Sequence, residues 1–194
     1  MLRSVFPKEK GSLMTGCRTG AEHKWGLPSM PRVDAVWLHP AYQTSYRWLE
    51  ELERDRPFCR HQLRHLLDVA RIMWIGNLEK GLGLDREVVY ATALLHDVGK
   101  PVQYTMGAPH EEVGARLADG ILRSLSGDVA FSAAEREAIV QAIWAHRRFD
   151  ADAKPLARLL YQADKASRPC FACPAEVRRA CSWSDAKKNL GISV

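Results

Sequence analysis

A histidine and an aspartate stand side by side at the end of an apolar stretch. His96 and Asp97 follow the run Ala93-Leu94-Leu95 and precede Val98, a glycine and a lysine. Burying an imidazole and a carboxylate together costs several kcal/mol if neither is paired. A divalent cation would remove that cost, because neutral imidazole and carboxylate are its natural ligands. The pair therefore indicates a metal site, and a capped helix end is the alternative.

Further residues of the same chemistry lie beside expected core positions; they are His65, His110, His146 and Asp164. An unpaired ionisable group would be costly at each of these places. Separate helices can direct such side chains to the middle of a bundle, which favours one shared site. Two alternatives stay open. His110 would be exposed if it only begins a helix, and His146 would suit the dipole at a helix end.

The elements that must position these residues all have a helical period. Apolar residues recur every three or four positions, and no alternating strand pattern of useful length appears. Gly99 and Pro101 are expected to end the helix that carries His96. With 194 residues, the chain suits one all-α domain. The predicted helices are 41–54, 59–78, 86–96, 109–125, one that follows the capping box Ser132-x-x-Glu135, and 155–167.

Three segments in this order resemble the HD-domain phosphohydrolases. The matching pieces are His65-Leu-Leu-Asp-Val-Ala-Arg, Leu94-Leu-His-Asp-Val-Gly-Lys100 and Ala163-Asp164-Lys165. The resemblance spans about residues 41–190 and implies an HD-domain helical bundle. It also implies that His65, His96, Asp97 and Asp164 hold a first metal ion. His110 and His146 resemble the subgroup with two metals, in which Asp97 would bridge.

The resemblance further implies hydrolysis of a phosphate ester or anhydride, foremost of a nucleotide or a related small phosphometabolite, by metal-activated water. Asp97 and Lys100 are the expected catalytic residues, and the cofactor is one or two ions of Mn, Fe, Co, Ni, Zn or Mg. Arg147 and Lys165 lie next to ligand positions and could contact phosphate. His61 lies four residues before His65, where substrate contact and ordinary partial burial are both open.

Four cysteines have a spacing typical of metal sites. Cys170-x-x-Cys173 is followed by Cys181, and Cys59 is expected to start the helix that carries His65. If the C-terminal segment folds back on that start, four thiolates meet, which suits zinc or an iron–sulfur cluster. The alternative is four reduced, partly buried thiols.

The net charge of +5 is unevenly spread. Residues 1–29 hold five Lys or Arg against two Glu, which is more than half of the excess. The rest of the chain therefore has little excess positive charge with which to bind nucleic acid.

The domain organisation follows from composition. We expect a flexible leader over 1–29, which is a translation-start artefact if Met30 is the start. An HD helical domain over 30–168 and a cysteine-containing segment over 169–194, packed on that domain, would follow. Without a secretory signal or membrane span, the expected location is the cytoplasm.

Two other functions compete with the hydrolase. A regulatory HD domain would sense a metal or nucleotide without catalysis, and a di-iron protein of HD type would act as an oxygenase. An intact ligand set favours the enzyme, because a sensor need not keep a reactive His-Asp pair.

Overall fold

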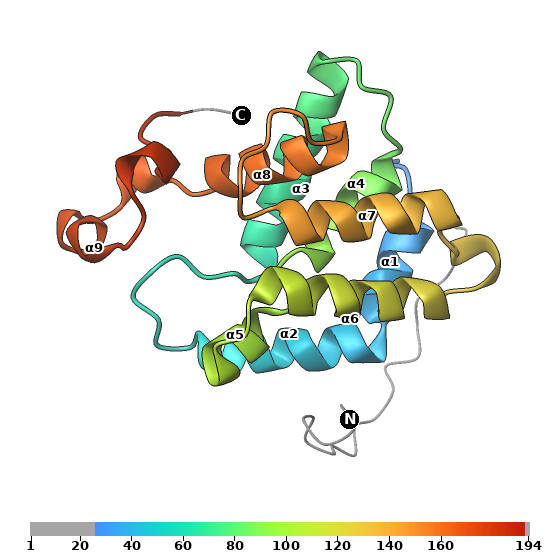
Figure 1. Ribbon diagram of the computed structural model, residues 1–194, viewed down its shortest axis with the longest axis horizontal. Coiled ribbons are helices and arrows are strands. Elements are labelled where there is room, and N and C mark those ends of the chain that lie inside the picture. The colour runs from blue at the N-terminus through green and yellow to red at the C-terminus, as the bar shows by residue number, and fades with distance from the viewer. Residues whose placement is uncertain (1–25, 193–194) are drawn as a thin grey trace.

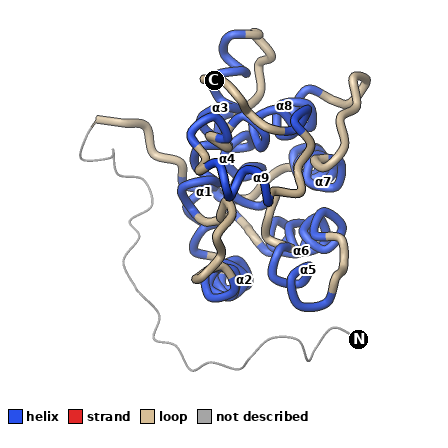
Figure 2. Tube along the Cα trace, turned by 90° about the vertical axis from the view of Figure 1, so that its left-hand side faces the viewer, coloured by secondary structure: helices blue, strands red, loops and turns tan. Residues whose placement is uncertain are grey.

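Helices form the framework of residues 26–192, the part of the chain that the computed structural model describes. No strand occurs in this range, and loops and short 3-10 turns join the helices (Figure 2). The predicted all-α fold class is therefore confirmed. Residues 1–25, most of the predicted leader, lie outside the described residues. The α-helices are α1 (Pro31–Leu38), α2 (Pro40–Leu52), α3 (Leu63–Glu79), α4 (Arg86–Leu95), α5 (Lys100–Met106), α6 (His110–Ser124), α7 (Ala133–Ala145), α8 (Pro155–Ala166) and α9 (Ala175–Ala180).

Helix α4 lies at the centre of the bundle. Asp85 begins it, because its side chain accepts a hydrogen bond of 3.0 Å from the backbone N–H of Val88. Most of its residues are small or branched apolar side chains that are buried. Helices α3, α7 and α8 pack around it (Figure 1). The chain that leaves α4 therefore starts in the interior of the protein, which buries His96 and Asp97.

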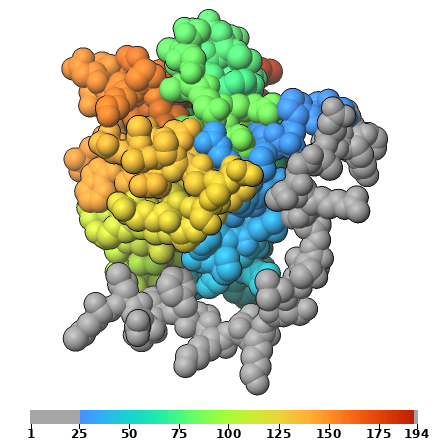
Figure 3. All heavy atoms as spheres, turned by 90° about the vertical axis from the view of Figure 1, so that its right-hand side faces the viewer, coloured from blue at the N-terminus to red at the C-terminus, as the bar shows by residue number. Residues whose placement is uncertain are grey.

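Arg32 in α1 joins three parts of the bundle. Its guanidinium lies 2.6 Å from Asp85 and 3.3 Å from Glu87 at the start of α4, and 3.0 Å from Glu135 in α7. It also lies over the ring of Phe131, 4.6 Å from the centroid. Figure 3 shows this face, where α1 (blue) adjoins the segment between α6 and α7 (yellow). The arginine thus holds α1 against the core.

Gly99 allows the turn after α4 to lie directly on α6. A Cβ atom at this position would lie 2.2 Å from the carbonyl oxygen of His110 and 2.6 Å from the backbone nitrogen of Gly114. Real side chains do not tolerate such distances to backbone atoms, so only glycine fits here. This contact places the first residue of α6, His110, beside the end of α4.

The structure corrects the predicted elements at three places. Helix α3 begins at Leu63, not at 59, so Cys59 lies in the preceding loop. Hydrogen bonds hold that loop in a non-helical path. The His61 N–H donates to the Glu53 carboxylate at 2.6 Å, and Arg168 donates to the Arg60 carbonyl at 2.7 Å. Helices α1 and α5 were not predicted. The helix before Gly99 and Pro101 ends as predicted, but Pro101 itself occupies the first turn of α5, where proline is favourable.

The chain after α8 forms short turns that return to that helix. The N–H of Phe171 donates to the carbonyl of Asn189 at 3.0 Å, and the Asn189 side chain donates to the carbonyl of Ala166 at 2.7 Å. Segment 169–192 is thus tied to the end of α8. Within residues 26–192, none of the helices combines the length and the apolar character needed to cross a membrane.

Candidate metal centre

The six predicted ligands converge at one buried place, and each is at most 6% exposed. All six lie in the end turns of helices or directly after them, where backbone directions allow side chains from separate helices to meet. His65 lies in the first turn of α3, His96 and Asp97 directly follow α4, His110 opens α6, His146 directly follows α7, and Asp164 lies in α8. The alternative that His110 is exposed as a simple helix start does not hold, because α6 begins against the turn at Gly99 and buries this side chain.

These side chains form two sets whose ligand atoms lie within 4.8 Å of one another. One set is His65, His96 and Asp164, and the other is Asp97, His110 and His146. In the first set, the Nε2 atoms of His65 and His96 lie 3.4 Å and 3.8 Å from Oδ1 of Asp164. In the second set, the Nε2 atoms of His110 and His146 lie 3.1 Å apart. Each set has the composition of a site for a divalent cation.

Asp97 contacts both sets, one through each carboxylate oxygen. Its Oδ2 lies 3.1 Å from Nε2 of His96 and 3.6 Å from Nε2 of His65. Its Oδ1 lies 3.4 Å from Nε2 of His110 and 3.9 Å from Nε2 of His146. The carboxylate thus lies where a ligand shared by two ions would have to be.

Hydrogen bonds fix which nitrogen three of the four imidazoles turn toward the centre. Nδ1 of His96 is 2.7 Å from the carbonyl of Ala93, and Nδ1 of His146 is 2.5 Å from that of Ile143. Nδ1 of His65 is 3.0 Å from the Ser167 hydroxyl. A carbonyl can only accept, so it selects the tautomer in which Nε2 carries the lone pair. Metal-binding histidines have this kind of outer support.

Burial shifts the pKa values of the histidines toward the neutral state that a metal needs. It lowers the pKa of His65 to about 3 and that of His146 to about 4. Burial also disfavours the charged form of His96, but the charges of Asp97 and Asp164 outweigh it and raise that pKa. For Asp97 itself, burial is outweighed by the charges of His96 and Lys100, which hold its pKa well below the usual range.

Buried polar atoms without a hydrogen bond indicate whether these residues fit a cation. Within the described residues, Nε2 of His96, Oδ2 of Asp97 and Nδ1 of His110 are buried and make no hydrogen bond. Such atoms are costly in a protein interior. Two of them, on His96 and Asp97, face the shared centre, where a cation would satisfy both. The residues therefore fit a divalent metal.

A cavity of about 110 Å³ adjoins this centre, and cationic side chains line much of it. The predicted substrate residues His61, Lys100, Arg147 and Lys165 all lie in its wall. Lys165 forms an ion pair with the ligand Asp164. Arg147 is about half-exposed and lies 3.3 Å from Glu111. The structure thus brings all four to one opening beside the ligands.

Sequence reasoning missed several residues of this cavity, foremost Arg168. Its guanidinium is buried and lies 2.9 Å from Nε2 of His65. Trp183 and Lys187 reach the cavity from the C-terminal segment. Glu53, which is fully buried, holds His61 through Nδ1 at 2.5 Å and through the backbone N–H. Glu53 lies in the charged run Glu50-Glu51-Leu52-Glu53-Arg54, so nothing in the sequence distinguishes it from its solvent-exposed neighbours.

Several known proteins resemble this chain in sequence. Residues 63–168 match the HD domain family. An uncharacterized protein of Clostridium beijerinckii is 43% identical over 163 residues, covering 84% of this chain and 99% of the relative. Ribonuclease Y of Oleidesulfovibrio alaskensis is 30% identical over 68% of this chain, and that of Aquifex aeolicus is 28% identical. This chain spans only 23% and 22% of the length of those two ribonucleases.

The fold has a relative among solved structures. The crystal structure of a "predicted HD superfamily hydrolase" from an uncultured Thermotogales bacterium superposes with a TM-score of 0.53 at 19% identity. The match covers 82% of this chain and 80% of that one. The resemblance inferred from the motifs is therefore confirmed. The chain belongs to the HD domain family, whose members are generally metal-dependent hydrolases.

Proposed function

We propose that the protein hydrolyses a phosphate ester or anhydride of a small metabolite, foremost a nucleotide. The observation that carries this proposal is the position of Asp97 between two ligand sets, next to a cavity lined by cations. His65, His96, Asp97 and Asp164 would hold one ion, and Asp97, His110 and His146 a second. Such ions would supply a water of lowered pKa, toward about 7, and would offset charge on phosphoryl oxygens.

The cations of the cavity suit a phosphoryl group. Burial lowers the pKa of Lys100, although Asp97 and Asp164 act in the opposite direction. A buried ammonium of this kind gains most from an anionic ligand, because little water competes for it. Lys100 and Lys165 would therefore orient the phosphoryl oxygens, and Arg147 would contact the more exposed part of the substrate.

Arg168 is the strongest additional candidate for phosphate binding. Its Nη2 donates to Nε2 of His65, and its Nε makes no hydrogen bond within the described residues. A metal ion on His65 would compete for the same lone pair and release the guanidinium. Because a guanidinium binds two oxygens of one phosphate at once, Arg168 could then hold the substrate beside the ligands.

A second candidate is cleavage of a phosphodiester in RNA, which the similarity to the ribonucleases Y favours. The small cavity favours the first candidate, since about 110 Å³ suits one phosphoryl group better than a polymer. The assay must therefore offer both substrate classes. The expectation that nucleic acid is not a partner remains a prediction.

The test is phosphate release from a panel of nucleotides and sugar phosphates, with an RNA oligonucleotide beside them, after loading with Mn²⁺ or Fe²⁺. We expect His96→Ala and Asp97→Ala each to abolish release while the helical circular dichroism signal survives. Asp68→Ala is the matched control, because Asp68 lies in α3 and, within residues 26–192, its ion pair is with Arg71 at the surface.

Retained phosphate release in both His96→Ala and Asp97→Ala would refute the proposal. Oxygen consumption with Fe²⁺ and no phosphate release would instead identify an oxygenase. Binding of metal or nucleotide without turnover of any substrate would identify a sensor.

A further inference from the structure

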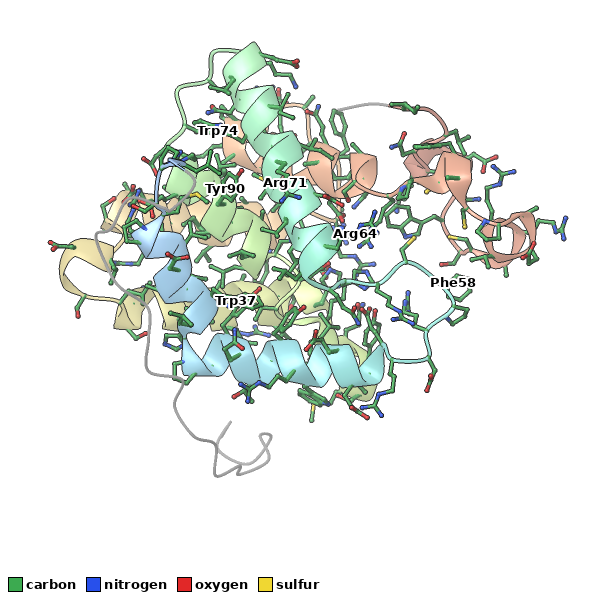
Figure 4. The ribbon with its side chains drawn as sticks, turned by 180° about the vertical axis from the view of Figure 1, so that it is seen from behind. Trp37, Phe58, Arg64, Arg71, Trp74 and Tyr90 are labelled. Carbon is green, nitrogen blue, oxygen red and sulfur yellow. The ribbon has the colours of Figure 1, made fainter. Side chains whose placement is uncertain are left out.

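Four cysteines from distant parts of the chain line one cavity beside the metal centre. The cavity has a volume of about 350 Å³, and Cys59, Cys170, Cys173 and Cys181 all contribute to its wall. All four thiols are free of disulfides. Figure 4 shows the loop that carries Phe58 next to the C-terminal segment, with sulfur atoms on both sides of the gap. The loop before α3 and the segment after α8 therefore meet through their sulfurs.

Local backbone structure presents these thiols to the cavity. Cys170 begins a short 3-10 turn, and the N–H of Cys173 donates to its carbonyl at 3.2 Å. Residues three apart on such a turn lie on the same side, so both sulfurs face one way. Cys181 ends α9. Cys59 is held nearby, because Arg168 at the end of α8 donates to the carbonyl of Arg60 at 2.7 Å.

The charges around the cavity suit thiolates. Arg56, Arg178 and Lys188 also line it. Cations near a thiol favour the thiolate, which is the form that binds metal. Burial and the neighbouring thiols Cys59, Cys170 and Cys181 raise the pKa of Cys173, as expected where several potential thiolates lie together. A bound cation would remove this mutual repulsion.

The spacing of the sulfurs distinguishes between two kinds of site. A single zinc ion with Zn–S bonds of about 2.3 Å brings its four sulfurs to about 3.8 Å from one another. Among the described residues, three or more ligand atoms lie within 4.8 Å of one another only in the two sets of the metal centre. No three of the four cysteine sulfurs lie that close together. A cubane cluster separates its thiolates further, because each binds a different iron.

We propose that Cys59, Cys170, Cys173 and Cys181 bind a [4Fe–4S] cluster in this cavity, with one thiolate on each iron. The cluster links the loop before α3 to the C-terminal segment. This proposal is independent of the hydrolytic reaction, since none of the four cysteines belongs to the metal centre.

The cluster would also shape the cavity next to the metal centre. His61, Arg168 and Trp183 line both cavities. Trp183 lies two residues after Cys181, and its ring is 5.3 Å from Nζ of Lys165. Losing the cluster would free the segment that carries Trp183 and Lys187. If the proposed function holds, KM for the phosphorylated substrate would rise more than kcat would fall.

The test is the content of iron and acid-labile sulfide in full-length protein that is purified without oxygen and reconstituted with Fe²⁺ and sulfide. We expect about four of each per chain, with a broad visible absorption that dithionite bleaches. Cys173→Ser should lose the sulfide and the absorption. Cys17→Ser is the matched control, because Cys17 is the fifth cysteine of the chain and is not one of the four proposed ligands.

A second variant separates this proposal from the function. Asp97→Ala should lose phosphate release but retain all sulfide, since Asp97 lies in the other site. Wild-type protein that takes up no sulfide would overturn the proposal, as would one zinc per chain lost in Cys173→Ser, or a disulfide between Cys170 and Cys173. If Cys173→Ser does not fold, the iron and sulfide content of the wild-type protein is by itself the test of the proposal.

Discussion

Replacing Gly99 with alanine should damage one half of the metal centre and spare the other. The added Cβ would lie 2.2 Å from the carbonyl oxygen of His110, whereas ordinary contact begins at 3.4 Å. The start of α6 would have to move by about 1.2 Å relative to the turn after α4. Metal ligands tolerate displacements of only about 0.2 Å. His110 would therefore leave the second ligand set, while His65, His96 and Asp164 stay in place.

The same overlap predicts a loss of stability. Forcing one extra carbon against packed backbone costs about 2–3 kcal/mol, within the range for overpacking. For a chain of this size the melting temperature would fall by about 4–12 °C. The fall should appear in metal-free protein as well, because it arises from backbone contact and not from a lost ligand.

Two measurements check this reasoning on Gly99→Ala. Thermal unfolding followed by circular dichroism in EDTA gives the stability, and titration calorimetry with Mn²⁺ gives the number of ions bound, which should fall from two to one. Gly120→Ala is the matched control in α6, since its Cβ would meet nothing within 4 Å. It should be stabilising by up to about 1 kcal/mol through helix propensity. A Gly99→Ala variant with unchanged melting temperature and two bound ions would refute the reasoning.

Two further predictions follow from Arg32 and from the buried histidines. Arg32→Ala should cost about 2 kcal/mol in urea unfolding, because two partly buried carboxylates, Glu87 and Glu135, and the exposed Asp85 lose one shared donor. Arg123→Ala, which breaks one exposed pair at 2.8 Å, should stay within about 0.5 kcal/mol, and equal effects of the two would contradict this view of α1. In metal-free protein, His65 and His146 have folded pKa values of about 3 and about 4, below the ordinary 6.5. The unfolded chain binds more protons in this interval, so stability should be complete above pH 6.5 and fall as the pH drops toward 4. The raised pKa of His96 acts in the opposite direction, but burial also lowers the pKa values of His61 and His110, which act in the same direction as His65 and His146. A urea midpoint that rises between pH 7 and pH 5 would contradict this assignment.

Local features of the chain were sufficient to predict the fold class and the ligand types. The apolar period of α3, the capping box of α7 and the proline that begins α8 are set by neighbours within one helix turn or two. The order of His65, His96-Asp97 and Asp164 identified the family, because each ligand is embedded in its own short apolar motif. These features do not depend on how the helices pack.

Tertiary packing alone decided the rest of the site. The helical period does not reveal that Asp97 directs one oxygen to each ligand set, since this depends on where α3, α6 and α7 end relative to α4. Nor does it reveal that Arg168 reaches His65, more than one hundred residues earlier. The predicted start of α3 was wrong because the His61 N–H donates to Glu53 and Arg168 donates to the Arg60 carbonyl, which holds residues 59–62 in a loop. Spacing along a chain reports which face is buried, whereas distances between faces are set by side-chain volumes and by close contacts such as that at Gly99.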